Sequence, residues 1–196
     1  MHTLYVSFNK VVIFVAPSVL LADLPFPFAD SILFFFSSKM FSKSNQESGF
    51  QTVKGAKILV TGSSGLVGAR LVEMLLERGA KLVRAFDVVP VNDVLKKRFD
   101  LASGGNASRI ECVVGDLTVK DQCVEACKDI EIVYHVAALV GPFHDRDKYM
   151  AVNYEGTLNL MEGSRIQAKV ASKKVKFVYS SSPSTRFTGA DVTGQR

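Results

Sequence analysis

The sequence predicts an α/β fold built on a doubly wound parallel sheet. From residue 57 onward, short apolar runs alternate with longer segments whose apolar residues recur at helical spacing. A glycine-rich run directly follows the first of the short apolar runs. Strands and helices that alternate in this way form a parallel sheet with helices on both faces.

The first half of this pattern contains two strands and two helices. Residues 57–61, KILVT, are a short apolar run typical of a buried strand, and residues 66–78 carry apolar side chains at helical spacing. Residues 81–86 predict a second strand. Residues 91–102 then predict a helix.

The second half repeats the alternation. Residues 110–114 predict a third strand that ends at Gly115, and residues 118–127 predict a helix. Thr118 and Asp121 have the spacing of a capping box, so we expect Thr118 to cap that helix. A fourth strand at 131–136, a long helix at 147–167 and a fifth strand at 175–180 complete the series.

Length and composition allow one such domain. Of 196 residues, 47% are hydrophobic and 22% charged, enough for one core but short for two domains. The net charge of +5 comes from scattered residues, so we do not expect nucleic acid as a partner. Cys112, Cys123 and Cys127 form no CxxC pair, so we expect neither a disulfide framework nor a metal site.

Residues 1–50 differ in composition from the predicted domain at 51–196. Their longest apolar stretch, residues 11–22, is shorter than the roughly 20 residues of a membrane-spanning helix. Lys10 before this stretch resembles the start of a signal peptide, although Leu20 is bulky for a cleavage site. Two interpretations stay open: residues 11–36 target the protein or associate with a membrane, or the leader is not functional and Met40 is the start.

The strongest functional signal is the run TGSSGLVG, residues 61–68, between a strand and a helix. Gly62 permits a tight turn, Gly65 lets backbone approach a pyrophosphate, and Gly68 lets the helix press against the strand. Amides at the helix start would face the phosphates. Gly62, Ser64, Gly65, Leu66 and Gly68 are therefore candidate residues of a Rossmann-type dinucleotide site, and a plain strand-to-helix turn is the alternative.

Asp87 ends the second strand, nineteen residues beyond Gly68. A carboxylate at this position can accept hydrogen bonds from both ribose hydroxyls of an adenosine, and it would repel a 2′-phosphate. We therefore expect NAD rather than NADP, although Arg84 and Lys81 lie nearby. The alternative is an aspartate that only ends a strand.

These motifs resemble the extended short-chain dehydrogenases/reductases, which share the TGxxGxxG loop. Residues 115–117, GDL, are similar to the family element in which Asp116 and the amide of Leu117 contact adenine. In residues 135–138, HVAA, the resemblance places Ala137 and Ala138 against the cofactor. In residues 153–157, NYEGT, it implies that Asn153 supports a proton relay and a bend of the active-site helix. Without the resemblance, Asp116 is a turn residue, His135 a satisfied core histidine and Asn153 a solvated helix residue.

Residues 177–189 resemble the catalytic-serine strand of sterol 4α-carboxylate 3-dehydrogenases and 3β-hydroxysteroid dehydrogenases, with Ser182 as the catalytic serine. The resemblance implies NAD-dependent oxidation of a 3β-hydroxyl on a small-molecule sterol or steroid, with decarboxylation if the substrate is a 4α-carboxysterol. It also implies dimers, and a location in the cytoplasm or on the cytosolic face of the endoplasmic reticulum. Related families act on nucleotide sugars or aryl aldehydes.

One family element is missing from the sequence. None of the five tyrosines is followed by lysine four residues later, so the pair that transfers the proton is absent. We therefore expect an amino-terminal fragment, or else a non-catalytic dinucleotide-binding protein. In a fragment, the strand at 175–180 and the apolar face of the helix at 147–167 would lack their partners.

Overall fold

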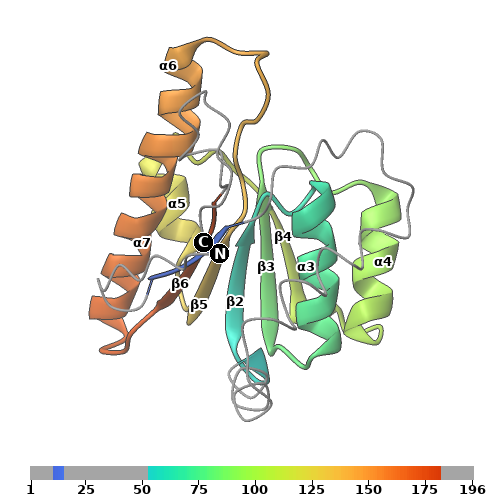
Figure 1. Cartoon of the computed structure of the whole chain (residues 1–196). Helices are drawn as coiled ribbons and strands as arrows, with labels where there is room; N and C mark the ends of the chain where they lie inside the picture. Colours follow the sequence, from blue (N-terminus) through green and yellow to red (C-terminus); the bar gives the residue numbers. More distant parts are fainter. Residues whose placement is uncertain (1–10, 16–52, 182–196) are drawn as a thin grey trace, which may run out of the picture.

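A computed structural model of the chain shows a six-stranded parallel sheet between two layers of helices (Figure 1). It describes residues 11–15 and 53–181. The sheet order is β1-β6-β5-β2-β3-β4, and every neighbouring pair is parallel. The strands are β1 (Val11–Val15), β2 (Lys57–Thr61), β3 (Leu82–Asp87), β4 (Ile110–Val114), β5 (Ile132–His135) and β6 (Lys176–Ser181).

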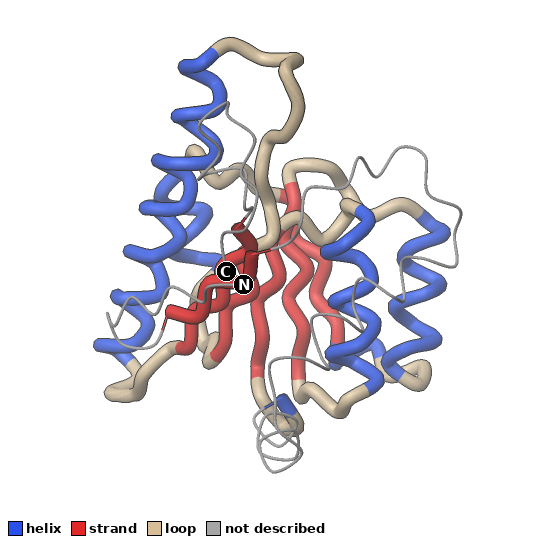
Figure 2. The backbone as a smooth tube through the Cα atoms, in the orientation of Figure 1, coloured by secondary structure: helices blue, strands red, loops and turns tan. Residues whose placement is uncertain are grey.

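The helices lie on both faces of this sheet (Figure 2), which confirms the doubly wound α/β fold. Helices α3 and α4 cover one face, and α5 and α7 cover the other. The long helices are α3 (Leu66–Glu77), α4 (Asp93–Ser103) and α7 (Gly156–Val170), and the shorter elements are η2 (Ala107–Arg109), α5 (Lys120–Ala126), α6 (Arg146–Tyr149) and η3 (Met150–Glu155).

The strand residues face two hydrophobic cores in alternation. In β2, Ile58 and Val60 join the core under α3 and α4, whereas Leu59 joins the core under α5 and α7. All three are fully buried. A central parallel strand is covered on both sides, which explains why its sequence is continuously apolar.

The second core contains two cysteines of helix α5. Cys123 and Cys127 have no exposed surface, and all three cysteines of the chain are free thiols. Burial raises the pKa of Cys127 to about 11 and that of Cys123 to about 12. These thiols therefore stay protonated at neutral pH and pack as small apolar side chains.

The predicted cap of α5 is wrong. The helix begins at Lys120, its N-cap is Val119, and no side chain accepts a hydrogen bond there. The amide of Thr118 instead donates to Asp116 Oδ1 over 2.8 Å. This local turn around Asp116 holds Thr118 outside the helix, so its hydroxyl does not act as a cap.

The helix predicted at 147–167 consists of three segments. A short α-helix, α6, continues into the π-helix η3 and then into α7, which ends three residues later than predicted. A π-helical turn inserts one residue into the helical repeat and is often found at functional sites.

The expectation that the last strand would lack a partner is also wrong. Strand β1 pairs with β6 in parallel from Val11↔Phe177 to Val15↔Ser181, so the leader supplies the strand at this edge. The rest of residues 1–50 lies outside the described residues. Within the described residues, no helix combines the length and apolarity needed to cross a bilayer.

Candidate functional site

The predicted dinucleotide-binding residues gather at the carboxyl edge of the sheet. Gly62 follows β2, Asp87 ends β3, Asp116 follows β4 and Ala137 follows β5. Strand order reverses beside β2, because β3 and β4 lie on one side of it and β5 and β6 on the other. Open α/β sheets bind ligands in the crevice at such a switch point.

The glycine-rich turn, residues 61–68, is tightly folded. Gly62 has φ of +71°, in the left-handed region that glycine tolerates best. A Cβ on Gly62 would lie 2.9 Å from the backbone of Ala137. A Cβ on Gly68 would lie 2.0 Å from the carbonyl oxygen of Gly62. The tight turn and the close helix packing predicted from these two glycines are therefore confirmed.

Helix α3 begins at this turn without a side-chain cap. Its N-cap is Gly65, and within the described residues no side chain forms a capping hydrogen bond there. Leu66 and Val67 are exposed, so the first turn of the helix faces outward. Uncapped amides and the positive end of the helix dipole are the features that hold a phosphate.

Asp87 is tied to the glycine-rich turn by its side chain. Its Oδ2 accepts a hydrogen bond from the amide of Ser64 over 2.9 Å, and its Oδ1 accepts from the amide of Val89 over 3.0 Å. The hydroxyl of Ser64 donates to the carbonyl of Val89 over 2.8 Å. Each carboxylate oxygen keeps a second acceptor position, so Asp87 can bind a diol while it holds the turn.

Asp116 and Leu117, the predicted adenine-contacting residues, directly follow β4. The amide of Asp116 donates to Gln122 Oε1 over 2.6 Å, and Asp116 is half-buried. The carbonyl of Leu117 accepts from Asn159 Nδ2 over 3.0 Å. Gln122 and Asn159 were not singled out from the sequence, because a polar residue on a helix gives no signal of its own.

Beyond β5, Ala137 is half-buried beside the glycine-rich turn and Ala138 is exposed. The amides of Val136 and Ala137 both donate to Thr61 Oγ1 over 3.2 Å. The exit of β5 is therefore fixed to the end of β2. A small side chain at Ala137 leaves room for the turn at Gly62.

His135 is a satisfied core histidine, with 1% of its surface exposed. Its Nδ1 lies 2.7 Å from Thr61 Oγ1 and its Nε2 lies 2.8 Å from Thr157 Oγ1. Burial lowers its pKa to about 4, so the ring is neutral at physiological pH. The sequence did not point to Thr61 or Thr157 as its partners, because only the folded sheet brings them together.

Asn153 lies in the π-helix η3 and is not a solvated residue. Its Nδ2 donates to the carbonyl of Leu139 over 2.9 Å, and its Oδ1 accepts from the Leu139 amide over 2.8 Å. This pair of bonds fixes η3 to the segment that leaves β5. The other predicted catalytic residue, Ser182, lies outside the described residues, directly after β6.

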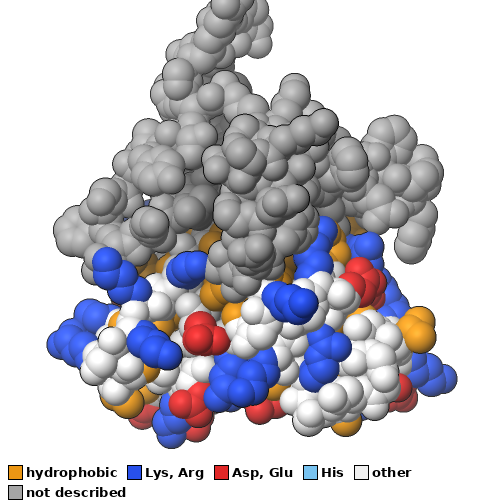
Figure 3. Space-filling view, turned by 90° about the horizontal axis from the view of Figure 1, so that it is seen from below, with side chains coloured by type: hydrophobic (Ala, Val, Ile, Leu, Met, Phe, Trp, Pro, Cys, Tyr) orange, Lys and Arg blue, Asp and Glu red, His pale blue; other side chains and the backbone are white. Residues whose placement is uncertain are grey.

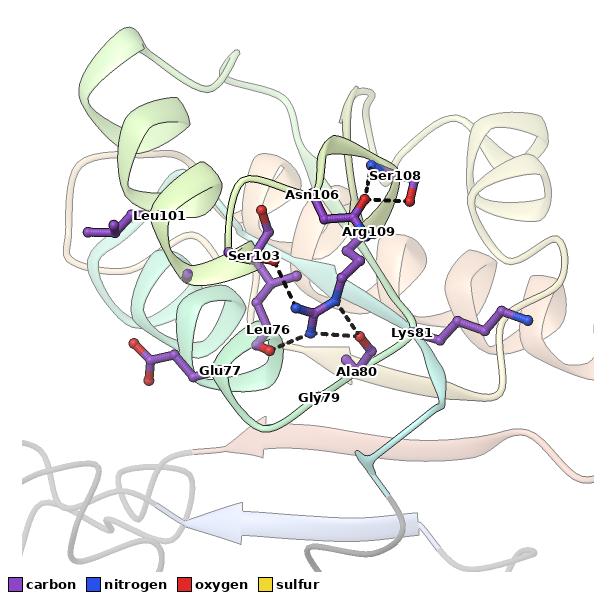
Figure 4. A pocket seen from close by; sticks show the side chains of 12 residues that line it. Leu76, Glu77, Gly79, Ala80, Lys81, Leu101, Ser103, Asn106, Ser108 and Arg109 are labelled. Carbon is purple, nitrogen blue, oxygen red and sulfur yellow. Dashed lines mark hydrogen bonds between the residues drawn. The ribbon is translucent and has the colours of Figure 1, made fainter.

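An open cavity of about 560 Å³ lies at the opposite end of the molecule (Figure 4). There Arg109 donates hydrogen bonds to the carbonyls of Leu76, Ala80 and Ser103. These bonds join the ends of α3 and α4, so we assign Arg109 a structural role.

Seen from the end of the molecule that holds this cavity, basic and acidic side chains are interspersed (Figure 3). Within the described residues, no group of His, Cys, Asp and Glu is arranged to hold a metal.

Comparison with known proteins gives a family match. A model of the 3-beta hydroxysteroid dehydrogenase/isomerase family matches residues 59–194. The chain is 35% identical over 150 residues to a 3 beta-hydroxysteroid dehydrogenase/Delta 5→4-isomerase of Mycobacterium tuberculosis, covering 73% of this chain and 36% of that protein. It is 30% identical over 139 residues to the decarboxylating sterol-4-alpha-carboxylate 3-dehydrogenase of Mus musculus, covering 71% and 33%. The chain thus spans about a third of the length of these relatives.

Solved structures share the fold. An NADH-dependent reductase, A1-R′, crystallised with NAD, superposes with a TM-score of 0.57 at 20% identity, over 72% of this chain and 65% of that one. Pen from Bacillus thuringiensis superposes with a TM-score of 0.54 at 22% identity, over 65% and 39%.

Proposed function

The chain belongs to the 3-beta hydroxysteroid dehydrogenase/isomerase family, and from this membership we propose that it forms the dinucleotide-binding part of a dehydrogenase. The reaction is oxidation of a 3β-hydroxyl on a sterol or steroid. The names of the Mycobacterium tuberculosis and mouse relatives support this substrate class. Residues 51–196 are the NAD-binding domain in this proposal.

The observation that carries the proposal is the geometry of the glycine-rich turn. Neither Gly62 nor Gly68 can carry a side chain without a backbone clash, and the helix that follows has no side-chain cap. A turn that is this tight and a helix start that is open together suit a pyrophosphate. The residues therefore fit a dinucleotide cofactor.

We propose NAD as the preferred cofactor. Asp87 places a carboxylate beside the turn, where a 2′-phosphate would be repelled. Arg84, the nearest basic candidate in β3, is bound to Glu111 at 2.7 Å and to the carbonyls of Ala126 and Lys128. Lys81 lines the cavity at the opposite end of the molecule. Neither side chain is placed to compensate a phosphate.

The bound nicotinamide would accept the hydride from the substrate carbon. In the proposed site, Ser182 donates a hydrogen bond to the substrate oxygen and Asn153 holds the backbone at Leu139. Transfer of the hydroxyl proton requires a tyrosine with a lowered pKa, and no tyrosine of this sequence has the lysine partner at the required spacing. We therefore propose that these 196 residues bind the cofactor but do not complete the reaction.

If the substrate is a 4α-carboxysterol, oxidation prepares a second step. The new 3-ketone accepts the electron pair of the bond to the carboxylate, and carbon dioxide leaves as an enolate forms. The mouse relative is named as decarboxylating, whereas the Mycobacterium tuberculosis relative is named as an isomerase. Dehydrogenation at position 3 is the step that the two names share.

The second candidate function is dinucleotide binding without catalysis, which the missing tyrosine and lysine favour. Calorimetric titration of the chain with NAD and NADP tests the function common to both candidates, and tighter binding of NAD is expected. If the chain binds neither NAD nor NADP, both candidate functions are wrong. Dimerisation, location at the endoplasmic reticulum and membrane contact through residues 11–36 stay predictions that sedimentation and cell fractionation would test.

A further inference from the structure

A network of hydrogen bonds runs from the sheet, where it is buried, to the half-buried Thr157 of helix α7. Thr61 ends β2, His135 ends β5, and Thr157 lies in the first turn of α7. Thr61 and His135 are 0% and 1% exposed. The imidazole bridges the two hydroxyls, at 2.7 Å from Thr61 and 2.8 Å from Thr157.

The number of hydrogen-bond partners fixes the direction of each bond. Thr61 Oγ1 already accepts from the amides of Val136 and Ala137, which fills its two lone pairs. Its proton is then donated to His135 Nδ1. The ring proton lies on Nε2, which donates to Thr157 Oγ1, and that hydroxyl donates to the carbonyl of Asn153 over 2.7 Å. Every donor in this hydrogen-bond network has an acceptor only in this arrangement.

The imidazole ring is also held in place by aromatic contacts. Tyr179 stacks on it with ring centroids 5.3 Å apart, and Phe177 meets it edge-on at 6.0 Å. Both side chains come from β6. The ring therefore packs against side chains of β6 as well as bonding to the two threonines.

The two ends of this hydrogen-bond network lie at different parts of the proposed site. At one end, the amide of Ala137 is fixed beside Gly62, whose missing Cβ would lie 2.9 Å away. At the other end, the carbonyl of Asn153 belongs to the π-helix, and the side chain of Asn153 forms two hydrogen bonds with the backbone of Leu139. A shift of α7 would therefore reach the backbone beside the glycine-rich turn.

We propose that His135, as the neutral Nε2–H tautomer, is a positioning residue that couples the glycine-rich turn to the π-helical segment around Asn153. This inference rests on the proposed function, since it assigns to His135 the alignment of the two halves of that site. Nothing in it requires His135 to touch cofactor or substrate. A charged ring would offer a second donor to Thr61, which has no acceptor position left.

The first test is nuclear magnetic resonance of the full chain labelled with ¹⁵N-histidine. Long-range proton–nitrogen correlations at pH 7 distinguish the two tautomers of each histidine. We expect the His135 ring to carry its proton on Nε2, and a proton on Nδ1 would overturn the inference. This measurement needs neither a variant nor a cofactor.

The second test uses a pair of variants at Thr157. Thr157→Val keeps the shape but removes the hydroxyl, and Thr157→Ser keeps the hydroxyl. We expect Thr157→Val to speed amide exchange at Val136 and Ala137 and to weaken NAD binding about threefold to tenfold, the loss typical of one hydrogen bond. Thr157→Ser should restore both.

Ser164→Ala is the matched control, because Ser164 lies on the same helix and also donates to the carbonyl four residues earlier, over 2.9 Å. It does not contact the histidine, so it should leave exchange at Val136 and Ala137 and NAD affinity unchanged. If Thr157→Val lowers the melting temperature but, like Ser164→Ala, leaves amide exchange and NAD affinity unchanged, the proposed coupling through His135 is wrong. If the unmodified chain binds no NAD, the proposed function fails, and tautomer and exchange data alone decide the coupling.

Discussion

Gly68 lies so close to Gly62 that the Cβ it lacks would be 2.0 Å from the Gly62 carbonyl oxygen and 2.6 Å from the carbonyl carbon. The obstacle is backbone, which cannot rotate away as a side chain can. Helix α3 and the glycine-rich turn are therefore in contact along their main chains.

We expect Gly68→Ala to abolish measurable NAD binding, because a methyl group must push α3 away from the turn. Calorimetry measures the affinity, and circular dichroism shows whether the fold persists. Gly65→Ala is a graded control: its Cβ would lie 3.3 Å from the same oxygen, so part of the affinity should remain. Equal affinity of Gly68→Ala and the unmodified chain would contradict the site.

Asp87→Ala should weaken NAD binding about tenfold or more and narrow the preference over NADP. The variant loses charge-assisted bonds to the ribose and the acceptor for the Ser64 amide. Asp93→Ala changes the charge equally at an exposed carboxylate of α4 and should leave both affinities unchanged. Equal affinities for the two nucleotides in the unmodified chain would show that the NAD preference is wrong.

The chain should lose stability in mild acid because of His135. Its pKa is about 4 in the folded state against an ordinary 6.5, so the unfolded chain binds the proton first as pH falls. The stabilisation is complete above pH 6.5 and is lost between about 6.5 and 4, by up to about 3 kcal/mol.

Chemical denaturation at several pH values measures this loss. His135→Gln cannot titrate and should show a shallower decline, while His144→Gln, at an exposed position, should follow the unmodified chain. The same slope in all three proteins would show that His135 does not bind a proton on unfolding.

Purified chain of 196 residues should form no measurable NADH from a 3β-hydroxysterol and NAD. General acid–base transfer normally contributes about 10² to 10⁴-fold, and a serine hydroxyl without an adjacent base does not replace it. Absorbance at the NADH band measures turnover. Robust turnover that Ser182→Ala abolishes would prove this expectation wrong.

Removal of residues 1–49 should make the chain less stable and prone to associate. The edge of β6 would lose its pairing with β1, and Tyr154 of η3 and Leu158 and Met161 of α7 are already exposed. We expect the shortened chain to melt at least about 3 °C lower and to elute as larger species in size-exclusion chromatography. Identical melting and monomeric elution of both chains would exclude a stabilising role for β1.

Local patterns in the sequence were sufficient for most of the fold. The strands around the site are short apolar runs, and the glycine-rich turn has a spacing typical of a turn between a strand and a helix. The π-helix at 150–155 was missed because one extra residue in a single turn hardly alters helical periodicity. The cap at Thr118 was misassigned because the Thr118 amide, which a capping box would pair with the side chain of Asp121, instead donates to Asp116.

Contacts between distant segments were beyond the sequence. Thr61, His135 and Thr157 become neighbours only because β2 and β5 are adjacent in the sheet and α7 crosses beside them. The pairing of β1 with β6 joins residues more than 160 positions apart, and no local pattern specifies it. Each of these features depends on strand order, which the sequence does not state directly.

The sheet separates two cores that are also largely separate along the chain. The core under α3 and α4 takes all its buried residues from between Val53 and Phe99, apart from Ile132. The core under α5 and α7 takes only Leu59 and Phe86 from the first half, and all its other buried residues lie between Leu117 and Phe177. During synthesis on the ribosome the first layer can therefore close while the second is still being translated, as domains that fold from the amino terminus do. The proposed dinucleotide site, which needs the exits of both β2 and β5, would be completed only after the first half has a folded surface to receive the second.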